Sequence, residues 1–234
     1  MDLLLDPRKT HLQLVQRIAD ILRLLAYEDE LSNEELDKVW LLSNSSYKNE
    51  VYKALNEISV NLKPEHANFF FSKITERNPN EFRVEDFSCL SDLGKYSMDM
   101  DFKKKLVEFF LQIIKHAEDF KQDVQENAVA KFCEMIKPWD VEQKKVFFGE
   151  LVASINNNKG KSVTCLIALR QLLEETIDRI VNTYSYSNSY SYDSKAESAE
   201  SKLSKKEELQ KWLNSSIRDL DVVQVILEDF SAYW

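Results

Sequence analysis

Apolar residues recur at helical spacing along most of the chain. Three clear stripes each advance in steps of three or four residues, which places their side chains on one face of an α-helix. The stripes are Leu14, Ile18, Ile21 and Leu25; Phe102, Leu106, Phe110 and Ile113; and Leu166, Leu169, Leu173, Ile177 and Ile180. This pattern predicts a series of amphipathic helices.

Turn-forming residues divide the chain into helices of similar length. Breaks such as Asn78-Pro79-Asn80 separate the apolar stripes. Ser32 and Glu35 have the spacing of a capping box, and Pro64 suits the first turn of a helix. We predict helices at 8–28, 33–43, 47–61, 64–77, 83–95, 101–119, 123–137, 140–156, 162–182, 205–215 and 217–232.

The rhythm of these helices predicts the fold class. Two helices with their loops make a unit of about 36 to 40 residues, within the range of HEAT and armadillo repeats. The units show no strong similarity to one another, so an irregular helical bundle is the alternative. We predict an all-α fold, an armadillo/HEAT-like superhelical stack of helix pairs, in which residues 1–182 form the scaffold.

Residues 183–204 differ in composition from the rest of the chain. Serine dominates this segment, and four tyrosines between positions 184 and 192 alternate with polar residues. Such alternation is typical of a strand, but no second strand is available to pair with it, so we predict a disordered Ser/Tyr-rich linker. Residues 205–234 are predicted to add a further helical pair that continues the scaffold.

Composition and charge narrow the classes of function. The 234 residues include only 3 glycines and 4 prolines, and the formal net charge is −9. Sparse glycine argues against most α/β enzymes, and net acidity disfavours nucleic acid and anionic membrane surfaces as partners. No apolar run approaches the roughly 18 residues of a membrane-spanning helix, and no secretory signal is evident. We expect protein partners, no nucleic acid and no membrane.

The three cysteines, Cys89, Cys133 and Cys165, are few, odd in number and widely spaced. They form no CxxC pair, which argues against a disulfide framework and against structural zinc. This cysteine usage indicates a reducing compartment, and we expect the protein to lie in the cytoplasm, with the nucleus as a second location. All three lie in apolar helical stretches, where a thiol acts as a small hydrophobe. Cys165 lies nearest a helix start, after Ser162, and is therefore the best candidate nucleophile.

Other catalytic and binding motifs are absent from the sequence. The only histidines, His11, His66 and His116, form no i, i+4 pair and no HExxH motif, and we expect His116 on a solvent-facing flank. No glycine-rich phosphate loop occurs, and carboxylate pairs such as Glu174-Glu175 are typical of solvated helix faces. We expect no catalytic residue, no cofactor-binding residue, no metal ligand and no cofactor.

The aromatic residues favour core packing. Phe69, Phe70 and Phe71 cover more than one helix face, as do Phe147 and Phe148, which is typical of a helix between two neighbours. Trp40 and Trp139 lie at a helix end and a helix start. The functional alternative for this set is a peptide groove lined with aromatic side chains.

Two segments carry a resemblance to a known family. Residues 31–74 resemble part of the non-catalytic helical region of very large ubiquitin-specific proteases of the fat-facets class, in which an L-x-x-x-x-L-D-x-[IV]-W pattern precedes a proline-started helix. The matching positions here are Leu31, Leu36, Asp37, Val39, Trp40, Leu55, Leu62 and Pro64. Residues 156–175 resemble a helix opening of the same region. Together the two segments anchor residues 10–182.

The resemblance implies an armadillo-like scaffold within a cysteine-type deubiquitinase, but it places no active site in this chain. The family's catalytic cysteine lies in a G-N-T-C-[YF] box. Thr164 and Cys165 share two letters of that box, whereas Val163 and Leu166 replace the asparagine and the aromatic residue. No histidine follows Cys165, although the family's general base lies C-terminal to its nucleophile. For these reasons, none of the family's catalytic residues can be assigned to a position in this chain.

We interpret the chain as a non-catalytic helical scaffold segment of a large cysteine-type deubiquitinase that supports substrate or partner binding. The partners would be ubiquitinated substrates or the catalytic domain of the same polypeptide. One alternative is a free-standing HEAT/armadillo-like interaction adaptor unrelated to ubiquitin. Another is a small helical enzyme that uses Cys165 or carboxylates.

Overall fold

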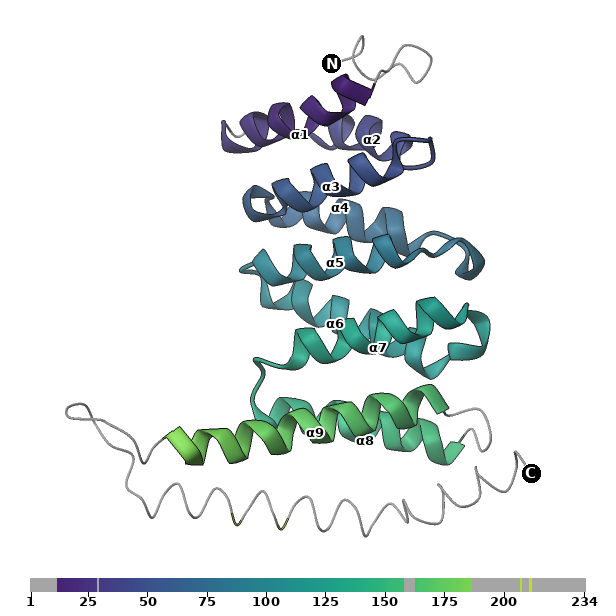
Figure 1. Ribbon diagram of the computed structural model, residues 1–234, viewed down its shortest axis with the longest axis vertical. Helices are drawn as coiled ribbons and strands as arrows, with labels where there is room; N and C mark the ends of the chain where they lie inside the picture. Colours follow the sequence, from purple (N-terminus) through teal and green to yellow (C-terminus); the bar gives the residue numbers. More distant parts are fainter. Residues whose placement is uncertain (1–11, 29, 158–162, 187–206, 208–210, 212–234) are drawn as a thin grey trace, which may run out of the picture. The chain divides into compact units, whose positions relative to one another are not determined.

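The computed structural model describes residues 12–28, 30–157 and 163–186, together with Glu207 and Lys211. Within these residues the regular elements are all helical, and none of the helices is both long and apolar enough to cross a membrane (Figure 1). The α-helices are α1 Leu12–Tyr27, α2 Asn33–Leu42, α3 Lys48–Ile58, α4 Pro64–Thr75, α5 Val84–Tyr96, α6 Met100–Lys115, α7 Gln122–Ile136, α8 Val141–Asn157 and α9 Val163–Tyr186. The 3-10 helices are η1 Ser59–Asn61, η2 Pro79–Glu81 and η3 Ala117–Asp119.

The chain divides into two compact units, Met1–Met135 and Ile136–Trp234. In the first unit, α3 packs between α1 and α5 in one layer, while α2 and α4 pack against each other in a second layer (Figure 1). Each loop is short enough to return the chain to the other layer. The first unit is therefore the all-α stack of helix pairs that the sequence predicts.

The second unit is described by α8 and α9, which pack side by side (Figure 1). Their interface buries aliphatic side chains such as Leu151, Ala168 and Leu172. Trp139 is buried just before α8, with its ring centroid 5.5 Å from that of Phe147, which is also buried. These contacts confirm the core packing predicted for the aromatic residues of this part of the chain.

Local sequence signals mark the helix starts as expected. Pro64 is the first residue of α4, where its missing N–H costs no hydrogen bond. The predicted capping box precedes α2: the Glu35 carboxylate accepts hydrogen bonds from the Ser32 backbone N–H at 3.2 Å and from the Ser32 hydroxyl. The hydroxyl bond is the main reason that the pKa of Glu35 is lowered. Asp99 caps α6 by accepting from the Asp101 N–H at 2.9 Å.

The largest differences from the predicted helix boundaries occur at three places. The predicted helices at 47–61 and 101–119 each end in a 3-10 turn, η1 and η3, which tightens the chain before the next loop. The linker predicted to begin at 183 is helical up to Tyr186, because no glycine or proline interrupts the hydrogen bonds of α9 there. The rest of the predicted linker and the 205–234 pair lie outside the described residues, apart from Glu207 and Lys211.

A cluster of phenylalanine rings fills the core of the first unit. The ring centroid of Phe87 on α5 lies 5.5 Å from that of Phe110 on α6 and 5.9 Å from that of Phe82. Phe71 reaches this cluster from α4, 5.7 Å from Phe109. The remaining members of the predicted core set behave similarly, since Trp40 and Phe70 are buried and Phe69 is partly buried. Core packing is thus confirmed for the aromatics on α2 and α4.

Replacement of glycine by alanine is expected to have opposite effects on stability at two positions within helices. A Cβ added at Gly94 on α5 would lie 2.7 Å from Leu106 Cδ1 and 2.8 Å from Met135 Cε, whereas one added at Gly149 on α8 would meet no atom within 4 Å. Gly94→Ala gains helix propensity but overpacks the core, which costs about 1–3 kcal/mol. We expect a net loss of about 1 kcal/mol for Gly94→Ala and a gain of about 0.5–1 kcal/mol for Gly149→Ala. Urea titration of both variants measures the difference, and equal effects would contradict it.

Candidate functional site

The three cysteines are buried in three different helices. Cys89 lies on α5, Cys133 on α7 and Cys165 on α9. Burial, followed by the nearby carboxylates of Asp86 and Asp92, raises the pKa of Cys89 above its usual range. Cys165 is the third residue of α9, as expected, but its side chain is only 2% exposed and its thiol donates to the Ser154 hydroxyl at 3.7 Å. All three thiols therefore have the environment of packing residues.

The two described histidines also lie on different parts of the chain, one on α4 and one just after α6. His116 is exposed just after α6, on the solvent-facing flank expected for it, whereas His66 is buried on α4. His66 Nε2 lies 3.7 Å from the Glu65 carboxylate. His11 lies outside the described residues. Within the described part of the chain, no group of three His, Cys, Asp or Glu side chains is arranged to hold a metal ion.

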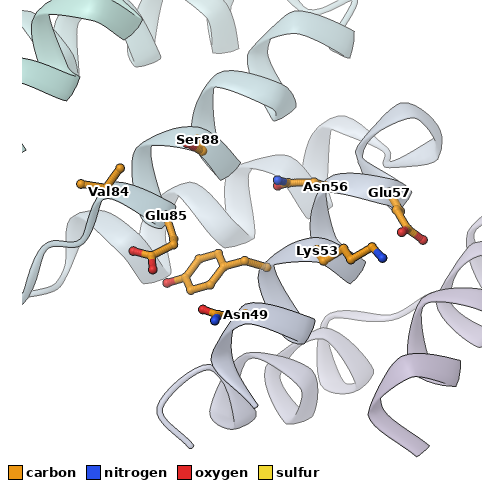
Figure 2. Close-up of a pocket in the computed structure, with 8 residues that line it drawn as sticks. Asn49, Lys53, Asn56, Glu57, Val84, Glu85 and Ser88 are labelled. Atoms are coloured by element: carbon orange, nitrogen blue, oxygen red, sulfur yellow. The ribbon is translucent and has the colours of Figure 1, made fainter. Parts of the chain in front are cut away.

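A groove between α3 and α5, which we call the α3–α5 groove, is the first candidate binding surface. It has a volume of about 630 Å³. Asn49, Lys53 and Asn56 line it from α3, and Val84 and Ser88 line it from α5 (Figure 2). The groove is open along one side. Most of the residues that line it are polar, but the surface that they expose in the groove is mainly apolar.

Two carboxylates at the edge of this groove are already paired with cations. Glu57 accepts a hydrogen bond from Arg23 Nη2 at 2.9 Å, which ties α3 to α1. Glu85 lies 3.4 Å from Lys48 Nζ, which ties α5 to α3. The pKa of Glu85 is lowered, first by the backbone N–H at its own position and then by Lys48. The Glu85 pair therefore links the two helices that form the groove, whereas the Glu57 pair links α3 to α1.

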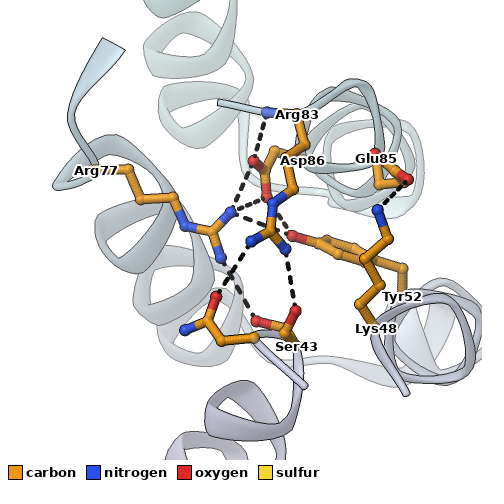
Figure 3. A network of polar contacts seen from close by, with 8 residues as sticks. Ser43, Lys48, Tyr52, Arg77, Arg83, Glu85 and Asp86 are labelled. Atoms are coloured by element: carbon orange, nitrogen blue, oxygen red, sulfur yellow. Dashed lines mark hydrogen bonds and ion pairs between the residues drawn. The ribbon is translucent and has the colours of Figure 1, made fainter. Parts of the chain in front are cut away.

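Beneath the groove lies a buried polar network centred on Asp86, the third residue of α5 (Figure 3). The Asp86 carboxylate is 0% exposed and accepts a hydrogen bond from the Tyr52 hydroxyl. Arg77 Nη1 donates to both Asp86 oxygens at 2.8 Å, and the Arg83 backbone N–H donates to Oδ2 at 2.9 Å. Burial, together with the negative charge of Asp86, raises the pKa of Tyr52 well above its usual range, so Tyr52 remains a donor.

The second candidate surface lies on the other side of this network, and we call it the Arg77 cleft. Its volume is also about 630 Å³. The Arg77 guanidinium lies 4.6 Å above the Trp40 ring, and Arg83 Nη1 donates to the Ser43 carbonyl at 3.0 Å. Lys73 and Lys121 also line the cleft, together with the carboxylates of Glu76 and Glu81.

The network thus connects the two surfaces. Tyr52 lines the α3–α5 groove with its ring and reaches Asp86 with its hydroxyl, while Arg77 reaches the same carboxylate from the wall of the Arg77 cleft. The lining of both hollows contains neither cysteine nor histidine. The arrangement presents hydrogen-bonding groups and charges on a rigid support, which suits recognition of another molecule.

The sequence contained no signal for this network. Asp86 resembles any acidic residue in the first turn of a helix, and Arg77 resembles any basic residue after a helix end. The contact between Asp86 and Tyr52 joins positions 34 residues apart, and only the packing of α3 against α5 creates it. Asn56 likewise resembles an ordinary polar residue on an amphipathic helix.

Comparison with known proteins identifies a family whose model matches this chain. The model of the UBP24/USP9X/USP9Y armadillo (ARM) repeat matches residues 1–233, almost the whole chain. The chain matches no curated protein and no solved structure. The family match, together with the helical stack, confirms the predicted armadillo-like all-α fold and the resemblance found at residues 31–74 and 156–175.

Proposed function

This chain belongs to the UBP24/USP9X/USP9Y armadillo-repeat family, and on that basis we propose that it is a non-catalytic scaffold segment of a large cysteine-type deubiquitinase. In this role it supports the binding of ubiquitinated substrates or of other protein partners. The observation that carries the proposal is the family match over residues 1–233. Armadillo repeats generally present extended surfaces for protein interaction, which agrees with two open hollows lined by polar side chains.

The burial of the thiols supports a non-catalytic role. A catalytic cysteine requires an accessible thiolate that is stabilised by a neighbouring base or cation. Cys165, the best candidate from the sequence, is instead buried beside the Ser154 hydroxyl. We further propose that the protein resides in the cytoplasm or the nucleus, where free buried thiols persist in reduced form.

We expect the 234-residue chain not to react with a ubiquitin-derived electrophile such as a C-terminal vinyl sulfone. Its three buried thiols lie on separate helices and have the environment of packing residues. Intact-mass spectrometry after incubation with the probe measures the fraction labelled, with an active ubiquitin-specific protease as positive control. Stoichiometric labelling that disappears in Cys165→Ser would overturn the non-catalytic assignment.

The scaffold role itself is tested in the full reading frame that encodes this chain. We expect that frame to encode a cysteine box and a histidine box outside these residues. Deletion of residues 12–186 is expected to leave hydrolysis of a small fluorogenic ubiquitin amide within about twofold while reducing cleavage of ubiquitinated proteins. A frame without such boxes would favour the free-standing adaptor, and equal loss on both substrates would contradict a separate scaffold role.

A further inference from the structure

Exposed apolar side chains gather at three turns of the first unit. Among the described residues of this unit, every large apolar side chain that is exposed, except Leu41, lies at the α1–α2, α3–α4 or α5–α6 turn. These residues are Leu24 and Tyr27 at the end of α1, Val60 in η1, and Tyr96, Met98 and Met100 between α5 and α6. A single exposed apolar residue is ordinary, whereas a recurrence at successive turns indicates an interaction surface.

The three turns lie side by side along one edge of the first unit (Figure 1). The 3-10 helix η1, which forms part of the α3–α4 turn, contacts both α1 and α5. The ion pair between Arg23 and Glu57, at 2.9 Å, joins the last turns of α1 and α3. We call this row of turns the turn edge. Tyr27, Val60 and Met98, one from each turn, are 79%, 58% and 94% exposed.

The turn edge is acidic around its apolar side chains. Residues 28–32, 59–65 and 97–101 contain six acidic residues and one basic residue, Lys63. Two cations at the margins are already engaged, since Arg23 is paired with Glu57 and Lys95 lies 5.4 Å from the centre of the Tyr96 ring. The excess of carboxylates favours a partner with lysine or arginine beside its apolar residues, and it disfavours an anionic membrane.

The spacing of the turns matches an α-helix. Packed helices lie about 8–10 Å apart, so the ends of α1, α3 and α5 recur along the turn edge at about that interval. Seven residues of an α-helix advance by about 10.5 Å and return the side chain to nearly the same face. In an extended strand, side chains on one face recur at about 6.6 or 13 Å, which does not match.

We propose that the turn edge binds an amphipathic α-helix of a partner protein. The helix carries an apolar side chain at every seventh position, opposite Tyr27, Val60 and Met98, and basic residues that face the carboxylates of the three turns. The unbranched side chain of Met98 adapts to apolar partners of different shape. This inference rests on the proposed protein-binding function and adds the surface and the chemistry of the partner.

Selection from a phage-displayed library of α-helices on the 234-residue chain tests the proposal. Each library member presents one helix with a randomised outer face on a stable three-helix protein. We expect recovered helices to carry apolar residues at every seventh position, flanked by lysine or arginine. Fluorescence polarisation with these proteins should show at least tenfold weaker binding to Tyr27→Ser and to Met98→Ser. Leu41→Ser, an exposed apolar residue outside the turn edge, is the matched control and should stay within twofold.

The charge of the turn edge is tested separately. Glu28, at the α1–α2 turn, is exposed and has no ion pair among the described residues. Glu28→Lys should weaken binding at least threefold in 50 mM salt, and this difference should disappear in 1 M salt, where charges are screened. An unchanged affinity at low salt would contradict the basic character proposed for the partner.

The stability of the variants separates a binding role from a structural one. Tyr27 and Met98 are exposed, so each serine variant should melt within about 2 °C of the unchanged chain. A clear drop in melting temperature for both would show that these side chains serve the fold and would overturn the proposal. Met98→Ser lies in a loop and covers the case in which Tyr27→Ser is poorly folded.

Four other outcomes would also overturn the proposal. These are recovery of no helix, recovery of helices that bind both serine variants normally, sedimentation of the chain with phosphatidylcholine vesicles, and self-association that Met98→Ser abolishes. The last two would assign the turn edge to a membrane or to a second copy of the chain. The deletion of residues 12–186 is read out independently, on ubiquitinated proteins. If that deletion still reduces cleavage, the scaffold function stands and only the turn edge is excluded as the binding surface.

Discussion

Asp86→Ala is expected to lower the free energy of unfolding by about 3–5 kcal/mol, because it leaves a buried guanidinium without its counter-ion. The Arg77 side chain is only 10% exposed, and Asp86 is its carboxylate partner. The substitution also removes the acceptors for the Tyr52 hydroxyl and for the Arg83 N–H at the start of α5. Urea titration followed by far-UV circular dichroism measures the loss.

The neighbouring residue provides a matched control for this prediction. Glu85 also forms an ion pair between α3 and α5, but both members of this pair are partly exposed: the side chain of Lys48 is 41% accessible and that of Glu85 is 38% accessible. Such pairs contribute about 0–1 kcal/mol, so Glu85→Gln should unfold close to the unchanged chain. If the two variants lose the same stability, the buried network does not support the packing of α3 against α5.

Phe87→Ala is expected to destabilise the protein by about 3–5 kcal/mol, the range observed when a buried phenylalanine is reduced to alanine. The Phe87 ring is 0% exposed and lies within 6.3 Å of the ring centroids of Phe82, Phe109 and Phe110. The ring of Phe82, which follows η2, and two rings from α6 surround the vacated space, and the α6 backbone is held by helical hydrogen bonds. The core therefore has little freedom to collapse into the cavity.

The control for the core variant is Met98→Ala in the loop before α6. Met98 is 94% exposed, so its truncation removes almost no buried surface and should change stability by less than about 0.5 kcal/mol. Thermal denaturation of both variants at the same pH compares them. A loss for Phe87→Ala as small as that for Met98→Ala would mean that the ring cluster can repack around the missing side chain.

Much of the fold could be predicted from the sequence, because its signals are local. The stripe through Phe102, Leu106 and Phe110 marks the buried face of α6 without reference to any other helix. Pro64 and the Ser32–Glu35 box mark helix starts through hydrogen bonds within one turn. Local signals were weaker at helix ends, where 3-10 turns replaced the last predicted residues and α9 continued to Tyr186.

The candidate site depended on contacts that no local pattern encodes. Asp86 meets Tyr52 across 34 positions and Arg77 across 9, and the reason is the packing of α3, α5 and the end of α4 in one unit. The sequence by itself determined the helices, the repeating pairs and the family resemblance, because these follow from short-range spacing and recurring motifs. Only the tertiary structure decided which polar residues are buried and paired and which, like Asn56, are left without a partner in a groove. Burial and pairing depend on neighbours that are distant in the chain, which is why spacing alone could not reveal them.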